Sequence, residues 1–206
     1  MNPVRRSLAI ALSLAPLALA WRGAFAQRAG PFNELQPPLP TEGDGKIEVL
    51  EFFWYGCIHC YNLEPKLDTW LKTKPADVAF RRVPAVLSDR WGHDATVFYA
   101  FEALGLLDKL HRPFFEAIHL QRLRSDNMAA LNDWLQKQGV DPKKFDATAR
   151  SFGVQSKVKR AIRLTADYKI DGTPAMAVQG RYTVGASDTM LDTVNQLVAA
   201  VRKNKQ

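Results

Sequence analysis

The chain has 206 residues, 47% of them hydrophobic, which is enough for one sizeable core or for one domain that carries an insertion. It holds 28 Lys and Arg against 21 Asp and Glu, and three of the arginines lie in the first 26 residues, which contain no acid. Without that segment the charge is 25 minus 21, or +4, an excess too mild to indicate a nucleic-acid partner.

Residues 1–26 have the order of parts typical of a secretory signal peptide. Arg5 and Arg6 form a short basic start, residues 8–20 are almost wholly apolar, and residues 24–26 (AFA) form a small-x-small cleavage site. The apolar run is shorter than the roughly 20 residues that a transmembrane helix takes. We therefore expect export and cleavage; the alternatives are a buried hydrophobic helix or an uncleaved membrane anchor.

The first part of the remaining chain predicts a parallel β-α-β unit. Residues 27–45 are rich in proline and glycine and predict an extended leader over the surface. Residues 46–55 (KIEVLEFFWY) are apolar on both faces, which is typical of a central strand. Residues 57–72 have helical spacing, with a kink expected at Pro65. Residues 78–84 (VAFRRVP) predict the second strand.

The second part is helical and then returns to strands. From residue 89 to 168 apolar residues recur with helical spacing, and glycines and an Asp-Pro pair divide the segment into four or five helices. Residues 175–178 and 181–184 predict a β-hairpin. Ser187 or Asp188 can cap a last helix with one buried side.

This order of elements predicts an α/β domain with an all-helical insertion near its middle. We place the first half of the α/β domain at residues 46–88, the insertion at residues 89–169 and the second half at residues 170–206.

The only two cysteines, Cys57 and Cys60, stand at the start of the first predicted helix. A bridge between them closes too short a loop to stabilise the fold much, but in an exported protein it can persist. The unpaired amides and the dipole at a helix start favour a thiolate at Cys57. We expect Cys57 to be the exposed attacking sulfur and Cys60 the buried resolving one, with His59 further favouring the thiolate.

Zinc binding is another use of such a cysteine pair. A tetrahedral zinc site takes four ligands, yet the chain has no other cysteine. His93, His111 and His119 do not form a pair with ligand spacing, and we interpret them as ordinary surface or core residues.

Gly172, Thr173 and Pro174 come just before the strand expected at residue 175. A proline that opens an interior strand is unusual. It fits a cis-proline turn that lies against the cysteines and leaves backbone free to pair with an extended peptide. An ordinary trans-proline turn is the alternative and stays open.

Together these motifs resemble the DsbA family of periplasmic thiol–disulfide interchange proteins. The likeness rests on VLEFF at residues 49–53, CIHCY at residues 57–61, the long helical insert and Thr173-Pro174, and it covers essentially the whole mature chain. It implies a thioredoxin fold with a helical insertion, a periplasmic location, no cofactor, and oxidation of thiols in unfolded or newly exported proteins. It also implies re-oxidation by a membrane, quinone-linked partner similar to DsbB, and we expect a monomer.

Position by position, the resemblance makes Cys57 the nucleophile and Cys60 the resolving cysteine. His59 matches the histidine that favours the thiolate. Pro174, preceded by Thr173, matches the cis-proline of the family.

Glu51, six residues before Cys57, matches a buried acid that assists proton transfer to or from Cys60; otherwise it is a strand acid that reaches solvent. Ile58 stands where the best-known members have proline, so the reduction potential is open. Pro65 is placed as in thioredoxins and does not choose the direction of electron flow. The alternative functions are therefore a disulfide reductase or isomerase of the same fold, or a non-catalytic thioredoxin-fold binding module.

Overall fold

The computed structural model describes residues 31–204, so the expected signal peptide lies outside the described residues. The strands are β1 (Asn33–Glu34), β2 (Ile47–Phe53), β3 (Val78–Pro84), β4 (Ala175–Val178) and β5 (Tyr182–Val184). The helices are α1 (Ile58–Thr73), α2 (Asp89–Ala103), α3 (Leu107–His119), α4 (Met128–Lys137), α5 (Pro142–Ala149), α6 (Phe152–Asp167) and α7 (Met190–Lys203).

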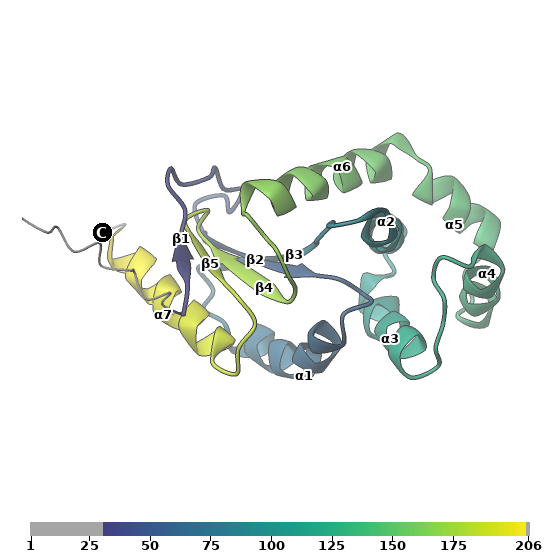
Figure 1. Cartoon of the computed structure of the whole chain (residues 1–206), viewed down its shortest axis with the longest axis horizontal. Helices are drawn as coiled ribbons and strands as arrows, with labels where there is room; N and C mark the ends of the chain where they lie inside the picture. The colour runs from purple at the N-terminus through teal and green to yellow at the C-terminus, as the bar shows by residue number, and fades with distance from the viewer. Residues whose placement is uncertain (1–30, 205–206) are drawn as a thin grey trace, which may run out of the picture.

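A five-stranded sheet in the order β1-β5-β4-β2-β3 forms the centre of the α/β domain (Figure 1). β2 and β3 pair in parallel, as the β-α-β pattern predicts, and the other neighbours pair antiparallel. All seven residues of β2 are buried, which confirms it as a central strand. The segment 27–45 is more than a surface leader, because Asn33 and Glu34 pair with β5 as an edge strand.

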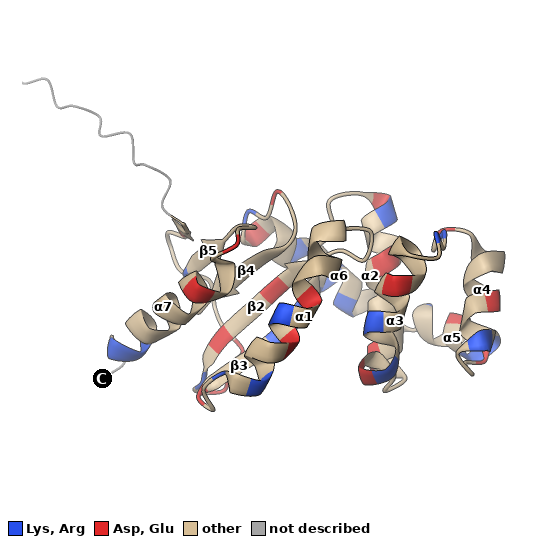
Figure 2. Cartoon of the chain, turned by 90° about the horizontal axis from the view of Figure 1, so that it is seen from below, with Lys and Arg blue, Asp and Glu red and all other residues tan. Residues whose placement is uncertain are grey.

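Alternation along β2 decides which helices each of its side chains meets, because successive side chains of a strand point to opposite faces. Ile47 and Val49 pack with apolar residues of α1 and α7, the two helices on one face of the sheet (Figure 2). Leu50 and Phe52 face the other side, where Phe52 meets Tyr168 at the end of α6. By the same alternation, Glu51 belongs to the face that α1 covers.

The insertion consists of five helices, α2 to α6, in agreement with the four or five predicted. α2 packs against α6 and also against α3; α3, α4 and α5 lie beyond one end of the sheet, and α6 runs back over the sheet (Figure 1). Its interior is built largely from buried aromatic rings, namely Phe98, Phe101, Phe114, Phe115 and Trp134. Because α3 also packs against α1, the insertion reaches the helix that carries the cysteines.

The predicted cap of the last helix was wrong. α7 begins at Met190, and its N-cap is Thr189, whose side chain makes no capping hydrogen bond. Ser187 lies in the turn before the helix, where its backbone carbonyl accepts a hydrogen bond from the N–H of Met190 at 3.2 Å. The turn is closed by backbone groups, so neither Ser187 nor Asp188 serves as the cap.

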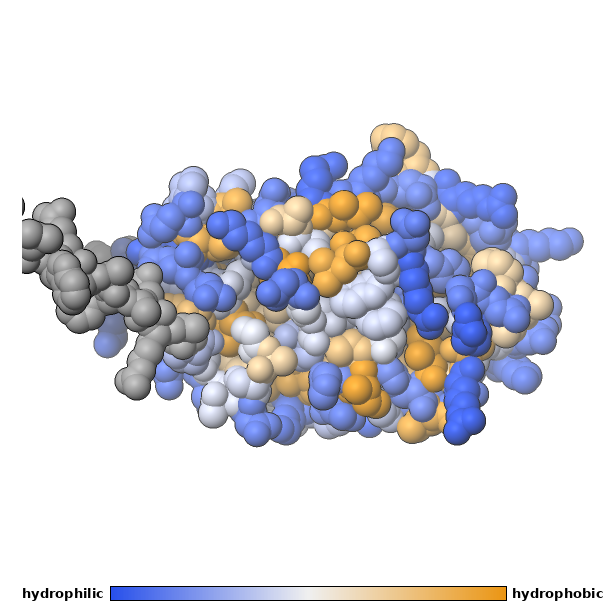
Figure 3. All heavy atoms as spheres, viewed as in Figure 1, coloured by the Kyte–Doolittle hydropathy of each residue, from blue (hydrophilic) through white to orange (hydrophobic). Residues whose placement is uncertain are grey.

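The surface seen in Figure 3 is mainly hydrophilic, with smaller apolar patches between charged side chains. Over residues 31–204, none of the helices combines the length and the apolar character that a membrane span requires.

Candidate active site

Cys57 lies where the chain passes from β2 into α1. The N–H of Cys57 donates to the carbonyl of Trp54 at 2.9 Å, which turns the chain after the strand. Cys57 is the N-cap of α1, and its Sγ accepts a hydrogen bond from the N–H of Cys60 at 3.4 Å. The sulfur therefore takes up one of the amides that a helix start leaves without a partner, as predicted. Both cysteines are free thiols here, with Cys57 half-buried and Cys60 buried.

The two sulfurs have opposite acid–base character. The hydrogen bond with Cys60 is the largest cause that lowers the pKa of Cys57, from 9.0 to about 5, against the opposing effect of burial. Thr173 and the backbone amides of Cys60 and His59 lower it further. Burial raises the pKa of Cys60 far above its ordinary value, and the hydrogen bond to Cys57 adds to the rise. At neutral pH the reduced motif thus holds one thiolate and one thiol.

The peptide bond between Thr173 and Pro174 is cis, as the resemblance implied, so the trans alternative was wrong. The carbonyl of Thr173 accepts a hydrogen bond from the Cys57 thiol at 3.3 Å, so this turn lies directly against the nucleophile. Pro174 and His59 line a groove of about 470 Å³, whose floor also includes Met190. A second hollow of about 210 Å³ lies on the other side of the turn. The turn next to the Cys57 thiol therefore borders both hollows.

His59 lies in the site, with its imidazole exposed at the groove. Its backbone amide is among the groups that lower the pKa of Cys57. The role of the imidazole itself stays a prediction.

Glu51 is fully buried, so the alternative of a strand acid that reaches solvent was wrong. Its carboxylate lies 3.1 Å from Nε of Arg82, which is the directly opposed residue on β3. Arg82 Nη2 also donates to Glu64 at 3.0 Å. Burial is the main cause that raises the pKa of Glu51 from 4.5 to about 8, and Arg82 only partly opposes it. Glu51 is therefore protonated at neutral pH in this structure.

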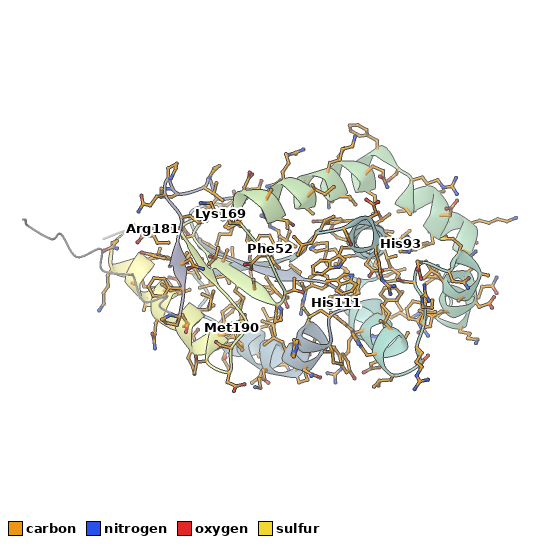
Figure 4. All side chains as sticks on the ribbon, viewed as in Figure 1. Phe52, His93, His111, Lys169, Arg181 and Met190 are labelled. Carbon is orange, nitrogen blue, oxygen red and sulfur yellow. The ribbon has the colours of Figure 1, made fainter. Side chains whose placement is uncertain are left out.

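His111 completes this group of buried ionisable side chains. It projects from α3 toward the end of the sheet and α1 (Figure 4). Its Nε2 lies 3.4 Å from Glu64 Oε1, and its Nδ1 is 2.8 Å from the hydroxyl of Tyr55. Glu64 is on the same buried face of α1 as Cys60, one turn further along. We refer to Glu51, Glu64, Arg82 and His111 as the charged cluster.

Trp54 packs against the backbone just before the Cys57–Cys60 motif. Its ring stacks on Trp91 with centroids 4.4 Å apart, and its Nε1 donates to the buried carboxylate of Asp94 at 2.7 Å. A Cβ at Gly56 would overlap the Trp54 ring, so a glycine allows the indole to pack on the backbone just before Cys57. Asp94 also accepts from Ser125 at 2.7 Å, so the residue through which Trp54 contacts the insertion is itself held in place.

The structure brings Cys57, His59 and the Thr173-Pro174 turn together at one site, with Cys60 buried beneath Cys57. Sequence reasoning missed the partners of Glu51. The signal for Glu64 was present, because Cys60 and Glu64 are four residues apart and share a helix face. Over residues 31–204, there is no group of three or more His, Cys, Asp or Glu side chains arranged to hold a metal ion.

His111 was interpreted as an ordinary residue, and its place in the cluster could not be read from its own helix. His119 of the same helix also has a defined role, because its Nε2 lies 2.8 Å from the carbonyl of Tyr55.

Comparisons with known proteins agree with this geometry. A sequence model of the family described as "DSBA-like thioredoxin domain" matches residues 92–197. The thiol:disulfide interchange protein DsbA of Burkholderia cepacia is 39% identical over 92% of this chain and 90% of that protein. DsbA of Bordetella pertussis is 41% identical over 86% of this chain and 88% of that protein.

Solved structures give the same result. The crystal structure of Pseudomonas aeruginosa DsbA superposes with a TM-score of 0.80 at 34% identity, covering 85% of this chain and 94% of that chain. NmDsbA1 of Neisseria meningitidis superposes with a TM-score of 0.74 at 32% identity, covering 84% of this chain and 93% of that chain. The fold is thus a thioredoxin fold with a helical insertion. With its half-buried Cys57, its buried Cys60 and its cis-proline turn, the chain belongs to the DSBA-like thioredoxin-domain family of thiol–disulfide oxidoreductases.

Proposed function

We propose that this protein is a periplasmic dithiol oxidase that donates a Cys57–Cys60 disulfide to newly exported proteins. The observation that carries the proposal is the contrast between the two sulfurs. The lowered pKa of Cys57, about 5, stabilises the reduced form as a thiolate and makes Cys57 a good leaving group. A disulfide whose reduced form is stabilised gives up its bond readily, which is the property of an oxidant.

The proposed cycle has two exchanges. A substrate thiolate attacks Cys57 Sγ and forms an S–S bond, and the Cys57–Cys60 bond breaks with its electron pair leaving on Cys60 Sγ. A second substrate thiolate then attacks the substrate sulfur of the mixed disulfide. Cys57 leaves as a thiolate, the substrate is oxidised by two electrons, and the protein is left as a dithiol.

Glu51 is assigned the proton that Cys60 needs. Cys60 is buried and its pKa is strongly raised, so it cannot persist as a thiolate after it leaves. Glu51 is protonated at neutral pH and shares Arg82 with Glu64, which lies one turn from Cys60. Its raised pKa, about 8, suits a group that donates a proton near neutral pH.

The cis-proline turn and the groove are assigned to substrate binding. Thr173 meets the Cys57 thiol, and Pro174 forms part of the wall of the groove. An extended substrate segment can pair with the exposed backbone of this turn, which would bring its own cysteine to Cys57. His59 at the same groove is assigned a supporting electrostatic role on the Cys57 thiolate.

Export and re-oxidation complete the proposal. The signal-like first 26 residues support a periplasmic location, where a disulfide persists. A membrane, quinone-linked partner similar to DsbB is proposed to restore the disulfide, and the protein is proposed to act as a monomer without a cofactor.

The magnitude of the thiolate effect can be compared with the oxidising power. Two pH units between the Cys57 pKa and pH 7 correspond to about 3 kcal/mol, reduced to about 2 kcal/mol because solvent screens a half-exposed sulfur. The established potentials of thioredoxin and DsbA, about −270 and −120 mV, differ by about 7 kcal/mol. Thiolate stabilisation would therefore supply about a third of that difference.

The test is the reduction potential of the Cys57–Cys60 pair, measured by equilibrating the mature protein with glutathione buffers. A potential near about −120 mV supports an oxidase. A potential near about −270 mV contradicts it and favours the reductase alternative, with Ile58 as the first position to change to proline. The non-catalytic alternative predicts a pair that does not equilibrate with glutathione at all.

A further inference from the structure

The charged cluster has an odd number of charges if its acids are all ionised. Glu51 and Glu64 share the single guanidinium of Arg82, at 3.1 and 3.0 Å. Two carboxylates and one guanidinium leave one uncompensated negative charge, and both carboxylates are buried. An uncompensated charge in such a place is costly, so the cluster favours holding one extra proton.

Two side chains are placed to hold that proton. Glu51 can take it as a carboxylic acid, and His111 can take it as an imidazolium beside Glu64. The ring of His111 is 7% exposed and has a partner on each side, Glu64 at 3.4 Å from Nε2 and Tyr55 at 2.8 Å from Nδ1. The Tyr55 hydroxyl can donate to a neutral Nδ1 or accept from a protonated one, so the ring keeps this hydrogen bond in both states.

We propose that Glu51 and His111 share one proton, so that His111, supplied by the helical insertion, becomes protonated when Glu51 ionises. The proposal rests on the proposed function only for the event that makes Glu51 ionise, which is proton donation to Cys60. His111 is then a positioning residue, because it acts on Cys60 through Glu64, Arg82 and Glu51.

The remaining surroundings of His111 are mainly aromatic. Phe53, Phe98 and Phe115 surround the ring with edge contacts at centroid distances from 5.2 to 5.8 Å. The ionisable groups that act on it are Glu64 and Asp68 of α1, Arg82 of β3 and Tyr55 of the β2–α1 connection, and Glu51 of β2 is linked to it through Arg82 and Glu64. Burial lowers the pKa of His111, and Glu64 opposes that shift, so the ring is neutral while Glu51 keeps its proton.

The protons balance in each turnover. The Cys57–Cys60 bond breaks, Cys60 Sγ takes the electron pair, and Glu51 gives it a proton and becomes a carboxylate. His111 then takes one proton from solvent and becomes an imidazolium. The cluster returns to zero net charge with two cations against two carboxylates.

The experiment is a carboxyl titration in the reduced protein, without substrate. Glutamate is labelled with ¹³C at the δ-carbon, and the Glu51 resonance is followed by NMR from pH 5 to 10. His111→Gln keeps an amide donor for Glu64 and an acceptor for Tyr55 but cannot take a proton. Because the glutamine cannot take up a proton when Glu51 ionises, Glu51 should hold its own proton more tightly in this variant. We expect its pKa to rise by about one unit or more, a tenfold or greater gain in proton affinity.

A matched control comes from the same helix. His119→Gln makes the same substitution at a residue that contacts the Tyr55 carbonyl and no carboxylate. It should leave the Glu51 titration unchanged. An unchanged Glu51 pKa in His111→Gln, or an equal shift in both variants, overturns the proposal in favour of a purely structural role.

Linkage supplies a second readout in a different variant. If protonation of His111 lowers the Glu51 pKa, ionisation of Glu51 must raise the His111 pKa by the same amount. Imidazole ¹⁵N shifts should therefore show a lower His111 pKa in Glu51→Gln than in the wild type, and identical His111 titrations contradict the proposal. A reductase-like potential would refute the proposed oxidase function but would not change the Glu51 and His111 titrations. Failure of the proposed function and failure of the shared proton are therefore distinguishable.

Discussion

Two buried glutamates on β2, three residues apart and on opposite faces of the sheet, have very different surroundings. Glu48 pairs with Arg81 at 3.2 Å and also accepts from the N–H of Glu42 at 3.1 Å, and the Arg81 side chain is 37% exposed. Glu51 is fully buried, and its ion-pair partner within residues 31–204 is Arg82, which it shares with Glu64.

The two glutamates therefore differ in how well their surroundings suit an ionised carboxylate. The Glu48 pair is a satisfied, partly hydrated ion pair that holds the leader against the sheet. The charged cluster has a single guanidinium for two carboxyl groups and therefore holds an extra proton, and its Glu64 lies one helical turn from the resolving cysteine. A single strand therefore carries one structural acid and one acid that is proposed to move a proton.

The largest expected difference is in the pH dependence of stability. The Glu51 pKa is raised from 4.5 to about 8 on folding, so between those values the folded state binds more protons than the unfolded state. The free energy of unfolding therefore falls as pH rises through this window, by about 5 kcal/mol in total. Urea denaturation of the oxidised protein, in which Cys57 does not titrate, measures this slope.

Glu51→Gln should remove that slope and make the protein more stable than wild type at pH 8, whereas Glu48→Gln should keep it. A wild-type protein whose stability rises steadily from pH 5 to 8 would show that Glu51 is ionised when folded.

The next largest difference is expected in the stability lost when Arg82 or Arg81 is replaced. Arg82→Met leaves the buried Glu64 carboxylate and the Glu51 carboxyl group without their shared cation and should cost about 4 kcal/mol of stability at pH 7. Arg81→Met removes a cation that is 37% exposed and leaves Glu48 its backbone hydrogen bond, so it should cost only about 1 kcal/mol. Urea midpoints of the two variants measure both losses of stability. Equal losses would mean that the Glu48–Arg81 pair and the charged cluster depend on their arginines to the same extent.

Exchange kinetics should separate the two acids by a smaller free energy. Glu51→Gln should slow reduction of the oxidised protein by a cysteine peptide roughly tenfold at pH 7, because Cys60 loses its proton donor. Glu48→Gln should react within about twofold of wild type. Rapid-mixing measurements test both, and a Glu51→Gln rate equal to wild type removes Glu51 from the proposed mechanism.

The smallest expected effect is on the exposed side of the motif. His59→Ala should make the reduction potential more negative by roughly 30 mV, since the imidazole is solvated and contributes only part of the thiolate stabilisation. The glutathione equilibrium measures it. An unchanged potential would leave the backbone amide of His59 as its only contribution.

Most of the fold could be predicted from local patterns. β3 matches its predicted bounds because a short run of strand-forming residues between turn signals is typical of a strand. The two-residue β1 could not be predicted, because its pairing with β5 depends on a contact across about 150 residues of sequence.

The site divides in the same way. Cys57, Cys60 and His59 are neighbours in sequence, and a helix start determines their chemistry, so the sequence was enough. The partners of Glu51 come from β3, α1 and α3, and only the register of β2 on β3 and the packing of α3 on α1 bring them together. The resemblance supplied Glu51, but it said nothing of Arg82 or His111.

The most direct test of the central contrast is a thiolate titration of the reduced protein, followed by absorbance at 240 nm, with Cys60→Ser as the control that leaves only Cys57. We expect the absorbance to develop with a midpoint near pH 5, with no second thiolate forming up to the pH of alkaline unfolding. A midpoint near pH 9, the ordinary value for a cysteine, would contradict it.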